Sequence, residues 1–255
     1  MQFEDHVAWV TGASSGIGRA VSRELADRGM DLALSARSRD GLEETARSCG
    51  GQDTEVLPLD VTDREATAAV AEQIRDRFGR LDLAVFNAGT YGRQEEGAIS
   101  SEAFERNIDV NWKGVIYGIE AALPLLREDE PGTVVGMSSA SAYAPLPRAS
   151  AYGSSKAAVN YMLNSLRLEW DHQGIEVDLC LVCPGFVKTP MTADNDFPMP
   201  FLMEVDEAAR RIVEGLARDR AEIHFPRRLT VPLKILDLLP RWLYEPLVSW
   251  FTRPS

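Results

Sequence analysis

The sequence of 255 residues predicts an α/β fold, in which one doubly wound parallel sheet of about seven strands carries helices on both faces. Short, almost continuously apolar runs alternate with segments of helical periodicity, which is typical of strands covered on both faces. Several helical segments stop at a glycine, where a left-handed cap can end a helix. No repeat, low-complexity tract or linker divides the chain, so a single domain accounts for it.

The predicted strands are the apolar runs, and turn residues or helical segments separate them. They comprise Val7–Val10, Asp31–Ala36, Glu55–Leu59, Asp82–Phe86, Thr133–Met137 and Val177–Val182, with Glu222–Phe225 as a weaker seventh candidate. Strands that alternate with helices in this way form parallel sheets with right-handed crossovers.

Helical periodicity fills most of the intervals between these strands. The predicted helices are Ile17–Arg28, Arg64–Phe78 and Ser154–Gln173, followed by Gly29, Gly79 and Gly174 as C-caps, one long stretch over Ser101–Leu126, and one near Glu207–Leu216. Thr62 or Asp63 is expected to cap the second of these helices, and Asp206 the last. We expect residues 1–225 to form the body of the domain and residues 226–255 an apolar, basic extension of it.

Composition and charge exclude several classes of protein. Hydrophobic residues make up 45% and charged residues 26% of the chain, as in ordinary soluble globular proteins. The net charge is −12, so the surface repels a phosphate backbone and no nucleic-acid partner is expected. The sequence shows no secretory signal and no apolar run of about 18 residues, which favours a cytoplasmic protein.

The three cysteines predict core packing rather than disulfide or redox chemistry. Cys49 stands alone, whereas Cys180 and Cys183 form a CxxC pair inside a predicted strand. Residues three apart on a strand face opposite sides of the sheet, so this pair is not expected to share a ligand. The three histidines show no metal-ligand spacing, and no metal site is expected.

A glycine-rich turn follows the first predicted strand and precedes the first helix. Its sequence, from Thr11 to Arg19, contains Gly12, Gly16 and Gly18, with Ser14, Ser15 and Ile17 between them. Such a turn places a dinucleotide pyrophosphate at the N-terminus of a helix, which makes the expected fold Rossmann-like. The first glycine permits the tight turn, the second a close approach of phosphate, and the third close packing of the helix.

The end of the second predicted strand indicates which dinucleotide is preferred. Sites that select NAD usually place a carboxylate there, where it binds the ribose 2′-hydroxyl. This chain has Arg37 and Ser38 instead, a cation and a hydroxyl donor suited to a 2′-phosphate. We therefore expect NADP(H) as the cofactor.

A tyrosine and a lysine four residues apart indicate acid–base chemistry. Tyr152 and Lys156 share one face of a predicted helix. An ammonium group beside a phenol favours the phenolate, so we expect Lys156 to lower the pKa of Tyr152 and to let it exchange a proton with a substrate oxygen. Ser139, at the end of a predicted strand, is expected to hydrogen-bond that oxygen. The neighbouring Ser138 competes for this role, although adjacent strand residues face opposite sides.

Taken together, these motifs resemble the short-chain dehydrogenase/reductase family over residues from about 5 to about 225. The segments that carry the resemblance are Thr11–Gly18, Asn87-Ala88-Gly89, Asn111, Ser139, Tyr152-Gly153-Ser154-Ser155-Lys156 and Pro184-Gly185. One departure is Phe86, where the family often has a first asparagine before Asn87. The combination and order of the motifs make the resemblance specific.

The resemblance implies further roles for single residues. Asn111 would hold a water that connects Lys156 to solvent, and Lys156 would hydrogen-bond the nicotinamide ribose. The remaining implied cofactor contacts are Asp60 and Val61 beside the adenine, Asn87, Ala88 and Gly89 along the cofactor channel, and Pro184, Gly185, Val187 and Thr189 over the nicotinamide.

The function implied is NADPH-dependent hydride transfer between nicotinamide and a carbonyl or secondary alcohol, with a lipophilic ketone, aldehyde or 3-oxoacyl group as substrate. Two alternatives are an alcohol dehydrogenase that works in the oxidative direction and a non-catalytic NADP(H)-binding regulator or scaffold. An intact set of Ser139, Tyr152 and Lys156 argues against the regulator, which would not need it.

Apolar residues in loops after the strand ends are candidates for the substrate pocket. They are Tyr91, Tyr143, Phe186, Met191, Phe197, Met199, Phe201 and Met203, and plain loop packing explains them equally well. The extension from Pro226 has five basic residues, two acidic ones, and several aromatics. It could cover the pocket, pack on a partner subunit, or lie on a membrane surface. The family resemblance also implies a homodimer or homotetramer, built on helices at about 101–128 and 150–173.

Overall fold

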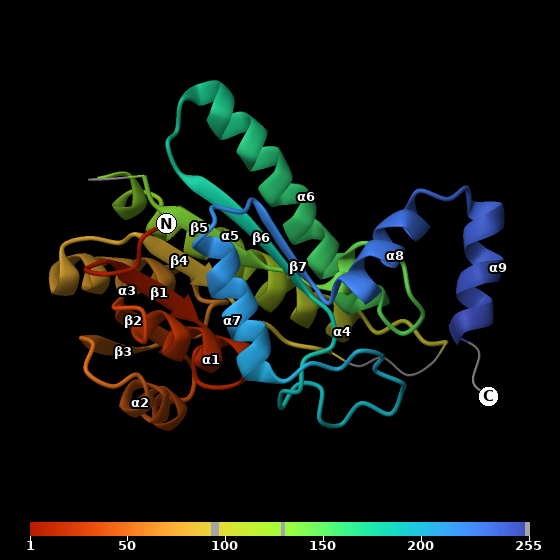
Figure 1. Cartoon of the computed structure of the whole chain (residues 1–255), viewed down its shortest axis with the longest axis horizontal. Helices are drawn as coiled ribbons and strands as arrows, with labels where there is room; N and C mark the ends of the chain where they lie inside the picture. The colour runs from red at the N-terminus through yellow and green to blue at the C-terminus, as the bar shows by residue number, and fades with distance from the viewer. Residues whose placement is uncertain (93–96, 129–130, 253–255) are drawn as a thin grey trace.

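The computed structural model describes residues 1–92, 97–128 and 131–252, and within them seven parallel strands form one sheet (Figure 1). The spatial order is β3-β2-β1-β4-β5-β6-β7. The strands are β1 (Val7–Thr11), β2 (Asp31–Ala36), β3 (Thr54–Pro58), β4 (Leu83–Phe86), β5 (Thr133–Met137), β6 (Asp178–Pro184) and β7 (Glu222–Phe225). The doubly wound fold is confirmed, and so is the weaker seventh strand at the edge.

Helices cover both faces of the sheet. The α-helices are α1 (Gly16–Ala26), α2 (Arg39–Ser48), α3 (Arg64–Phe78), α4 (Ser101–Ile108), α5 (Gly114–Ala122), α6 (Ser150–Gln173), α7 (Val205–Leu216), α8 (Arg227–Asp237) and α9 (Arg241–Thr252). A π-helical turn, η1 (Asp109–Lys113), joins α4 to α5, and short 3₁₀ turns form η2 (Leu125–Arg127) and η3 (Ala140–Ala142).

Two hydrophobic layers hold the helices to the sheet. One layer packs α1, α2 and α7 against one face, and the other packs α3, α5 and α6 against the opposite face. Alternate strand residues supply the two layers, as Val10 and Trp9 on β1 show. Cys180 and Cys183 likewise lie in different layers, so the CxxC pair is core packing on a strand, as predicted.

Several predicted helix boundaries are wrong. Residues 101–126 were expected to form one helix, but η1 separates α4 from α5, and α5 ends at Ala122. Helix α6 begins at Ser150, four residues before the predicted start at Ser154, so Tyr152 and Gly153 belong to the helix. Glu204 rather than Asp206 is the N-cap of α7, and Asp27 rather than Gly29 is the C-cap of α1, although Gly29 has a positive φ in the turn that follows.

Other local predictions are confirmed, and two helical regions were missed. Asp63 caps α3, and Gly79 and Gly174 are left-handed C-caps. Helix α2 has few apolar residues, so its periodicity is weak in the sequence. The C-terminal extension folds into α8 and α9, with Pro240 between them. Among the described residues, no helix combines the length and the apolar character needed to cross a bilayer.

Candidate active site

The glycine-rich turn lies between β1 and α1, at the carboxyl edge of the sheet. Gly12 has φ +67°, and a Cβ there would lie 2.8 Å from the Cα of Ala88. A Cβ on Gly18 would overlap the carbonyl oxygen of Gly12, so the first turn of α1 folds directly onto the loop. Ser15, the N-cap, makes no capping side-chain hydrogen bond to described residues, which leaves the first-turn amides for an anion. The shape and polarity of this turn fit a dinucleotide pyrophosphate.

Asn87, Ala88 and Gly89 follow β4 and brace this turn. The Asn87 Nδ2 donates to the carbonyl oxygens of Thr11 and Gly12, at 3.1 and 3.3 Å. The Thr11 Oγ1 in turn accepts from the backbone amides of Asn87 and Ala88, both at 3.1 Å. The ends of β1 and β4 are therefore locked into one unit.

The departure at Phe86 has a packing explanation. Its ring lies edge-on to Trp9, with ring centres 5.7 Å apart. A Cβ on Gly118 of α5 would overlap the same ring, so the absence of a side chain at Gly118 makes room for Phe86. The substitution thus serves the core between β4 and α5, and leaves Asn87 free to hold the glycine turn.

The end of β2 places Arg37 and Ser38 beside the glycine turn. The Ser38 Oγ accepts from the amide of Gly41, and a Cβ on Gly41 would lie 2.9 Å from the Cβ of Ser14. Arg37 is exposed, and no carboxylate among the described residues lies within ion-pair distance of it. Its charge helps to lower the pKa of Asp60 at the end of β3, after the larger effect of hydrogen bonds from Thr62.

Tyr152 and Ser139 meet where α6 begins beside the end of β5. A hydrogen bond joins the Ser139 hydroxyl to the phenol of Tyr152. The Ser139 Oγ also accepts from the amide and hydroxyl of Ser141, at 3.2 and 3.0 Å. Ser138 faces the other way and donates to the carbonyl oxygen of Lys156 at 3.0 Å, so it fixes α6 to β5. The alternation along the strand therefore places Ser139, and not Ser138, against the tyrosine.

Lys156 lies one helical turn beyond Tyr152 and is buried. Its Nζ donates to the carbonyl oxygen of Met137 at 2.7 Å and lies 5.9 Å from the centre of the Tyr152 ring. Burial lowers the pKa of Lys156 to about 8 and raises the pKa of Tyr152 to about 12. The expected lowering of the tyrosine pKa is thus wrong for this structure, because burial of the phenol is the largest effect on it and outweighs the hydrogen bond with Ser139.

Asn111 lies in the π-helical turn, close to Lys156. Its Oδ1 accepts from the amide of Thr90 at 2.8 Å, and its Nδ2 donates to Thr90, Asn107 and Ser155. A Cβ on Gly89 would lie 3.3 Å from the Asn111 Oδ1 and 3.5 Å from the Lys156 Nζ. The two side chains therefore flank the same small space, which the π-helical turn opens toward the site.

The loop after β6 closes over the glycine turn. Pro184 ends the strand, and the amide of Gly185 donates to the carbonyl oxygen of Phe225 at 2.7 Å. Further along, a Cβ on Gly16 would lie 3.3 Å from the Thr189 Cγ2. Val187 is buried and pairs with Met203 in an isolated bridge, which holds the two ends of the loop together.

The candidate pocket residues divide into groups. Tyr91 lies edge-on to Tyr152, with ring centres 5.2 Å apart, and the rings of Phe186 and Phe197 lie 6.0 Å apart. Met199 and Met203 are half-buried in the same loop, whereas Met191 and Phe201 are exposed to solvent.

Tyr143, the remaining candidate, is held by residues that sequence reasoning missed. Its hydroxyl donates to the Glu222 Oε1 at 2.6 Å, and the Lys234 Nζ donates to the Glu222 Oε2 at 2.8 Å. Lys234 also lies over the Tyr143 ring, 4.7 Å from its centre. Helix α8 thus reaches the segment just after Ser139, and no motif in the sequence links these three positions.

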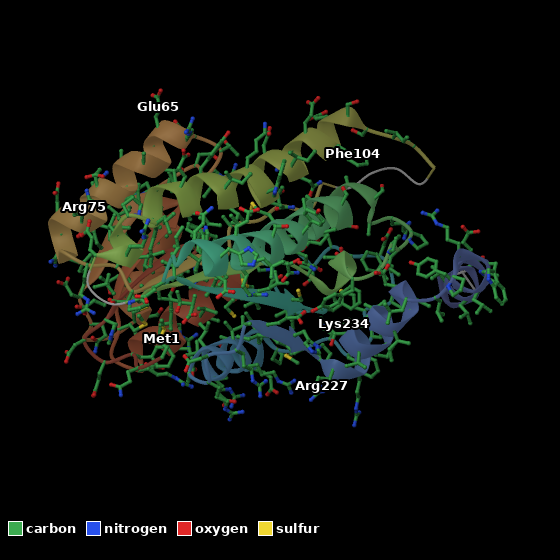
Figure 2. The ribbon with its side chains drawn as sticks, turned by 90° about the horizontal axis from the view of Figure 1, so that it is seen from above. Met1, Glu65, Arg75, Phe104, Arg227 and Lys234 are labelled. Carbon is green, nitrogen blue, oxygen red and sulfur yellow. The ribbon has the colours of Figure 1, made fainter. Side chains whose placement is uncertain are left out.

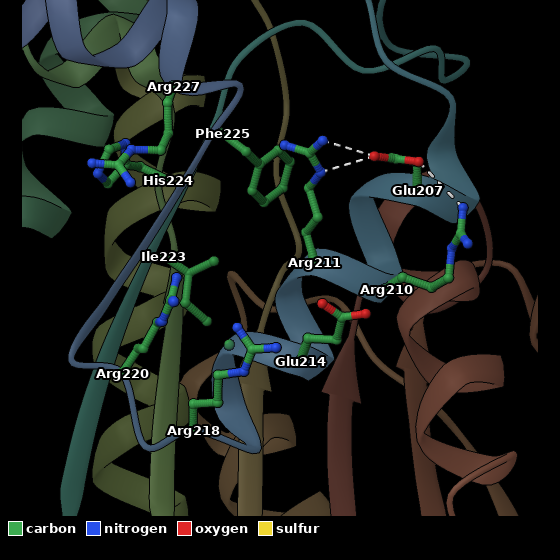
Figure 3. Close-up of a pocket in the computed structure, with 11 residues that line it drawn as sticks. Glu207, Arg210, Arg211, Glu214, Arg218, Arg220, Ile223, His224, Phe225 and Arg227 are labelled. Carbon is green, nitrogen blue, oxygen red and sulfur yellow. Dashed lines mark hydrogen bonds and ion pairs between the residues drawn. The ribbon is translucent and has the colours of Figure 1, made fainter.

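An arginine-lined groove of about 420 Å³ lies elsewhere, between α7, β7 and the start of α8 (Figure 3). Glu207 pairs with Arg210 and Arg211 along one wall. Arg218, Arg220 and Arg227 line the rest of it and have no ion-pair partner among the described residues. None of Ser139, Tyr152 and Lys156 lines this groove, so it is distinct from the candidate active site.

Comparison with known proteins agrees with this geometry. The family described as short chain dehydrogenase matches residues 6–197. An oxidoreductase of Myxococcus xanthus is 37% identical over 93% of this chain and 94% of its own length, and 11-beta-hydroxysteroid dehydrogenase A of Sesamum indicum is 34% identical over 86% and 68%.

Two solved structures share the fold. A short chain dehydrogenase/reductase from Burkholderia phymatum, in complex with NAD, has a TM-score of 0.84 at 23% identity and covers 100% of this chain and 98% of its own. An alcohol dehydrogenase from Thermococcus sibiricus, complexed with 5-hydroxy-NADP, has a TM-score of 0.77 at 30% identity and covers 86% and 95%. The fold, the match over residues 6–197 and these relatives show that the chain belongs to the short-chain dehydrogenase family of oxidoreductases.

Proposed function

We propose that this oxidoreductase uses NADPH to reduce a lipophilic ketone, aldehyde or 3-oxoacyl substrate to the alcohol. The observation that carries the proposal is the convergence of Ser139, Tyr152 and Lys156 at the carboxyl edge of the sheet, the edge that also carries the glycine turn. When bound there, the nicotinamide supplies the hydride.

The residues of this chain divide the remaining work. Tyr152, with a pKa of about 12, holds its proton at neutral pH and can donate it from Oη to the substrate oxygen. Ser139 donates a hydrogen bond to the same oxygen and stabilises the charge that develops there. Lys156, with a pKa of about 8, exchanges protons near neutral pH and can reprotonate Tyr152, with Asn111 beside it. This arrangement favours reduction over the oxidative direction, and a regulator that only bound the cofactor would have no use for it.

The preference for NADPH is proposed from the end of β2. Arg37 is exposed and unpaired among the described residues, and Ser38 follows it, so together they offer a cation and a hydroxyl for a 2′-phosphate. Asp60 and Val61, at the end of the adjacent β3, would border the adenine. No carboxylate ends β2, where an NAD-selective site would have one.

A lipophilic substrate is proposed from the residues near Tyr152. Tyr91 places aromatic surface against Tyr152. In the loop after β6, the rings of Phe186 and Phe197 lie together and the half-buried methionines can adapt to different shapes. The name of the Sesamum indicum relative, a hydroxysteroid dehydrogenase, supports a large apolar substrate.

A homodimer is proposed from α6. Tyr161 and Leu168 on this helix are 79% and 64% exposed, which is unusual for large apolar side chains that have no partner. Burial of α4 and α6 against a second copy would cover them. Light scattering that gave only the monomer mass at micromolar concentration would contradict this proposal.

The proposed function is tested by NADPH and NADH oxidation against ketones, aldehydes and 3-oxoacyl thioesters. Arg37→Ser is expected to lower kcat/KM for NADPH by about tenfold to a hundredfold, since it removes a charge-assisted contact, and to leave NADH unchanged. Arg39→Ser is the matched control, because Arg39 is also exposed but pairs with Glu43. The NADPH preference would be contradicted if Arg37→Ser lowered kcat/KM equally for NADPH and NADH, or if Arg39→Ser lowered it as much as Arg37→Ser.

A further inference from the structure

Exposed apolar side chains gather on the two C-terminal helices. Ile235 on α8 is 56% exposed, Leu238 at the C-cap of α8 is 82% exposed, and Trp242 at the start of α9 is 71% exposed. Leu243 and Leu247, four residues apart on α9, are also exposed and share one side of that helix. An apolar surface of this kind on a folded domain marks a contact with something else.

These helices are anchored to the body and project from one end of it. Figures 1 and 2, in views turned by 90°, both show α9 standing away from the sheet, with α8 between α9 and the body. Lys234 holds α8 through Glu222, and Leu229 packs against Gly185. Tyr244 holds α9 by a hydrogen bond to the carbonyl oxygen of Pro145. The apolar surface is therefore presented at a fixed position.

The charge of this extension is opposite to that of the remaining chain. Residues 226–255 contain five basic and two acidic side chains in a chain whose net charge is −12. Arg227, Arg228 and Arg241 are exposed, and Arg227 also lines the arginine-rich groove beside α7 (Figure 3). Arg253 and the side chains of Trp250 and Phe251 lie outside the described residues. Cations next to exposed leucine and tryptophan are complementary to a surface that is both anionic and apolar.

We propose that α8 and α9 form a docking surface for an anionic phospholipid membrane, on which the protein lies without crossing it. Pro240 lies between α8 and α9, and Pro232 and Pro246 lie inside them, so the segment forms two short helices that suit the plane of the interface. The Trp242 ring suits the level of the headgroups, and arginines pair with lipid phosphates.

The docking surface contacts the loop that follows Ser139 of the candidate active site. Pro145, which binds Tyr244, belongs to the loop that follows Ser139 and Tyr143. Phe201 and Leu202, in the loop that closes over the glycine turn, are exposed as well. On the proposed function, a lipophilic substrate dissolved in the bilayer would enter from this side. Docking itself does not depend on turnover, so the two proposals fail separately.

Sedimentation of full-length protein with vesicles tests the docking surface. Vesicles of phosphatidylcholine alone are compared with vesicles that contain about one third phosphatidylglycerol. Wild type is expected to sediment with the anionic vesicles, and more weakly as salt is raised. Leu238→Glu/Trp242→Glu should weaken this binding by at least about tenfold, since it removes apolar burial and adds negative charge. Ala69→Glu/Gln73→Glu, on the exposed side of α3 and outside both proposed contacts, adds the same charge and is the matched control that should bind like wild type.

Charge variants separate the electrostatic part. Arg227→Ser/Arg228→Ser should weaken binding to anionic vesicles by about 25-fold, at roughly fivefold per cation, and leave the neutral vesicles unaffected. Turnover of a water-soluble carbonyl compound should stay unchanged in these variants. Wild-type protein that stays in the supernatant with both vesicles would overturn the docking proposal. If, in addition, the Leu238→Glu/Trp242→Glu variant is a monomer in light scattering where wild type is a dimer, α8 and α9 form a subunit contact instead.

Discussion

Burial of Lys156 has a measurable thermodynamic consequence. Its pKa is lowered from 10.5 to about 8 because the ammonium loses its hydration in the core between α6 and β5. Between these two pH values the unfolded chain holds a proton that the folded chain has lost, so the free energy of unfolding must rise with pH there. Lys156→Met removes this titration and keeps a side chain of similar length.

The size of the effect follows from the two pKa values. Where the unfolded chain binds one proton more than the folded chain, the free energy of unfolding rises by about 1.4 kcal/mol per pH unit. Lys156 therefore contributes a rise of about 2 kcal/mol between pH 7 and pH 9.5. Urea unfolding of wild type and of Lys156→Met at several pH values in this range gives the difference directly. The stability gap between wild type and variant should shift in favour of wild type by about that amount as pH rises. If the free energies of unfolding of the two proteins change in parallel with pH, the lowered pKa of Lys156 is refuted.

Two further predictions concern the cofactor turn and the contact from α8. Gly18→Ala, which would overlap the backbone of the turn, should cost about 1–3 kcal/mol of stability and abolish measurable NADPH binding by fluorescence titration. Gly79→Ala, at a positive φ with open space around it, should cost stability and leave NADPH binding intact. Lys234→Met should leave Glu222 with fewer partners and loosen Tyr143, which raises KM for the carbonyl substrate several-fold while the Kd for NADPH stays constant. An unchanged KM would show that α8 does not position this segment.

Much of the fold could be predicted because the signals are local. Almost continuous apolar runs marked six strands, the alternating Glu222–Phe225 gave a weaker signal for the edge strand, and glycines marked the ends of α3 and α6. The interruption at η1 could not be predicted, since the sequence around Asn111 keeps helical periodicity and the π-helical turn depends on contacts with Thr90 and Ser155.

The candidate site could be predicted where function is carried by spacing. Tyr152 and Lys156 lie one helical turn apart. The spacing of the family resemblance selected Ser139, and strand alternation indicated that Ser138 could not share its role. The electrostatics could not be predicted in this way, because the pKa of Tyr152 depends on how deeply the phenol is buried. Contacts that join distant segments, such as Lys234 with Glu222, left no pattern in the sequence.

In the proposed reaction, Tyr152 transfers the proton to the substrate oxygen. Its most direct test is the single-turnover rate of NADPH oxidation, with a carbonyl substrate, in Tyr152→Phe and in Tyr91→Phe. The two rings are T-shaped, with centres 5.2 Å apart, so each variant removes one hydroxyl from the same neighbourhood. Tyr152→Phe should lower the rate by about 10²–10⁴-fold with the Kd for NADPH unchanged, and Tyr91→Phe should stay within severalfold of wild type. A Tyr152→Phe enzyme that turned over as fast as Tyr91→Phe would contradict the account.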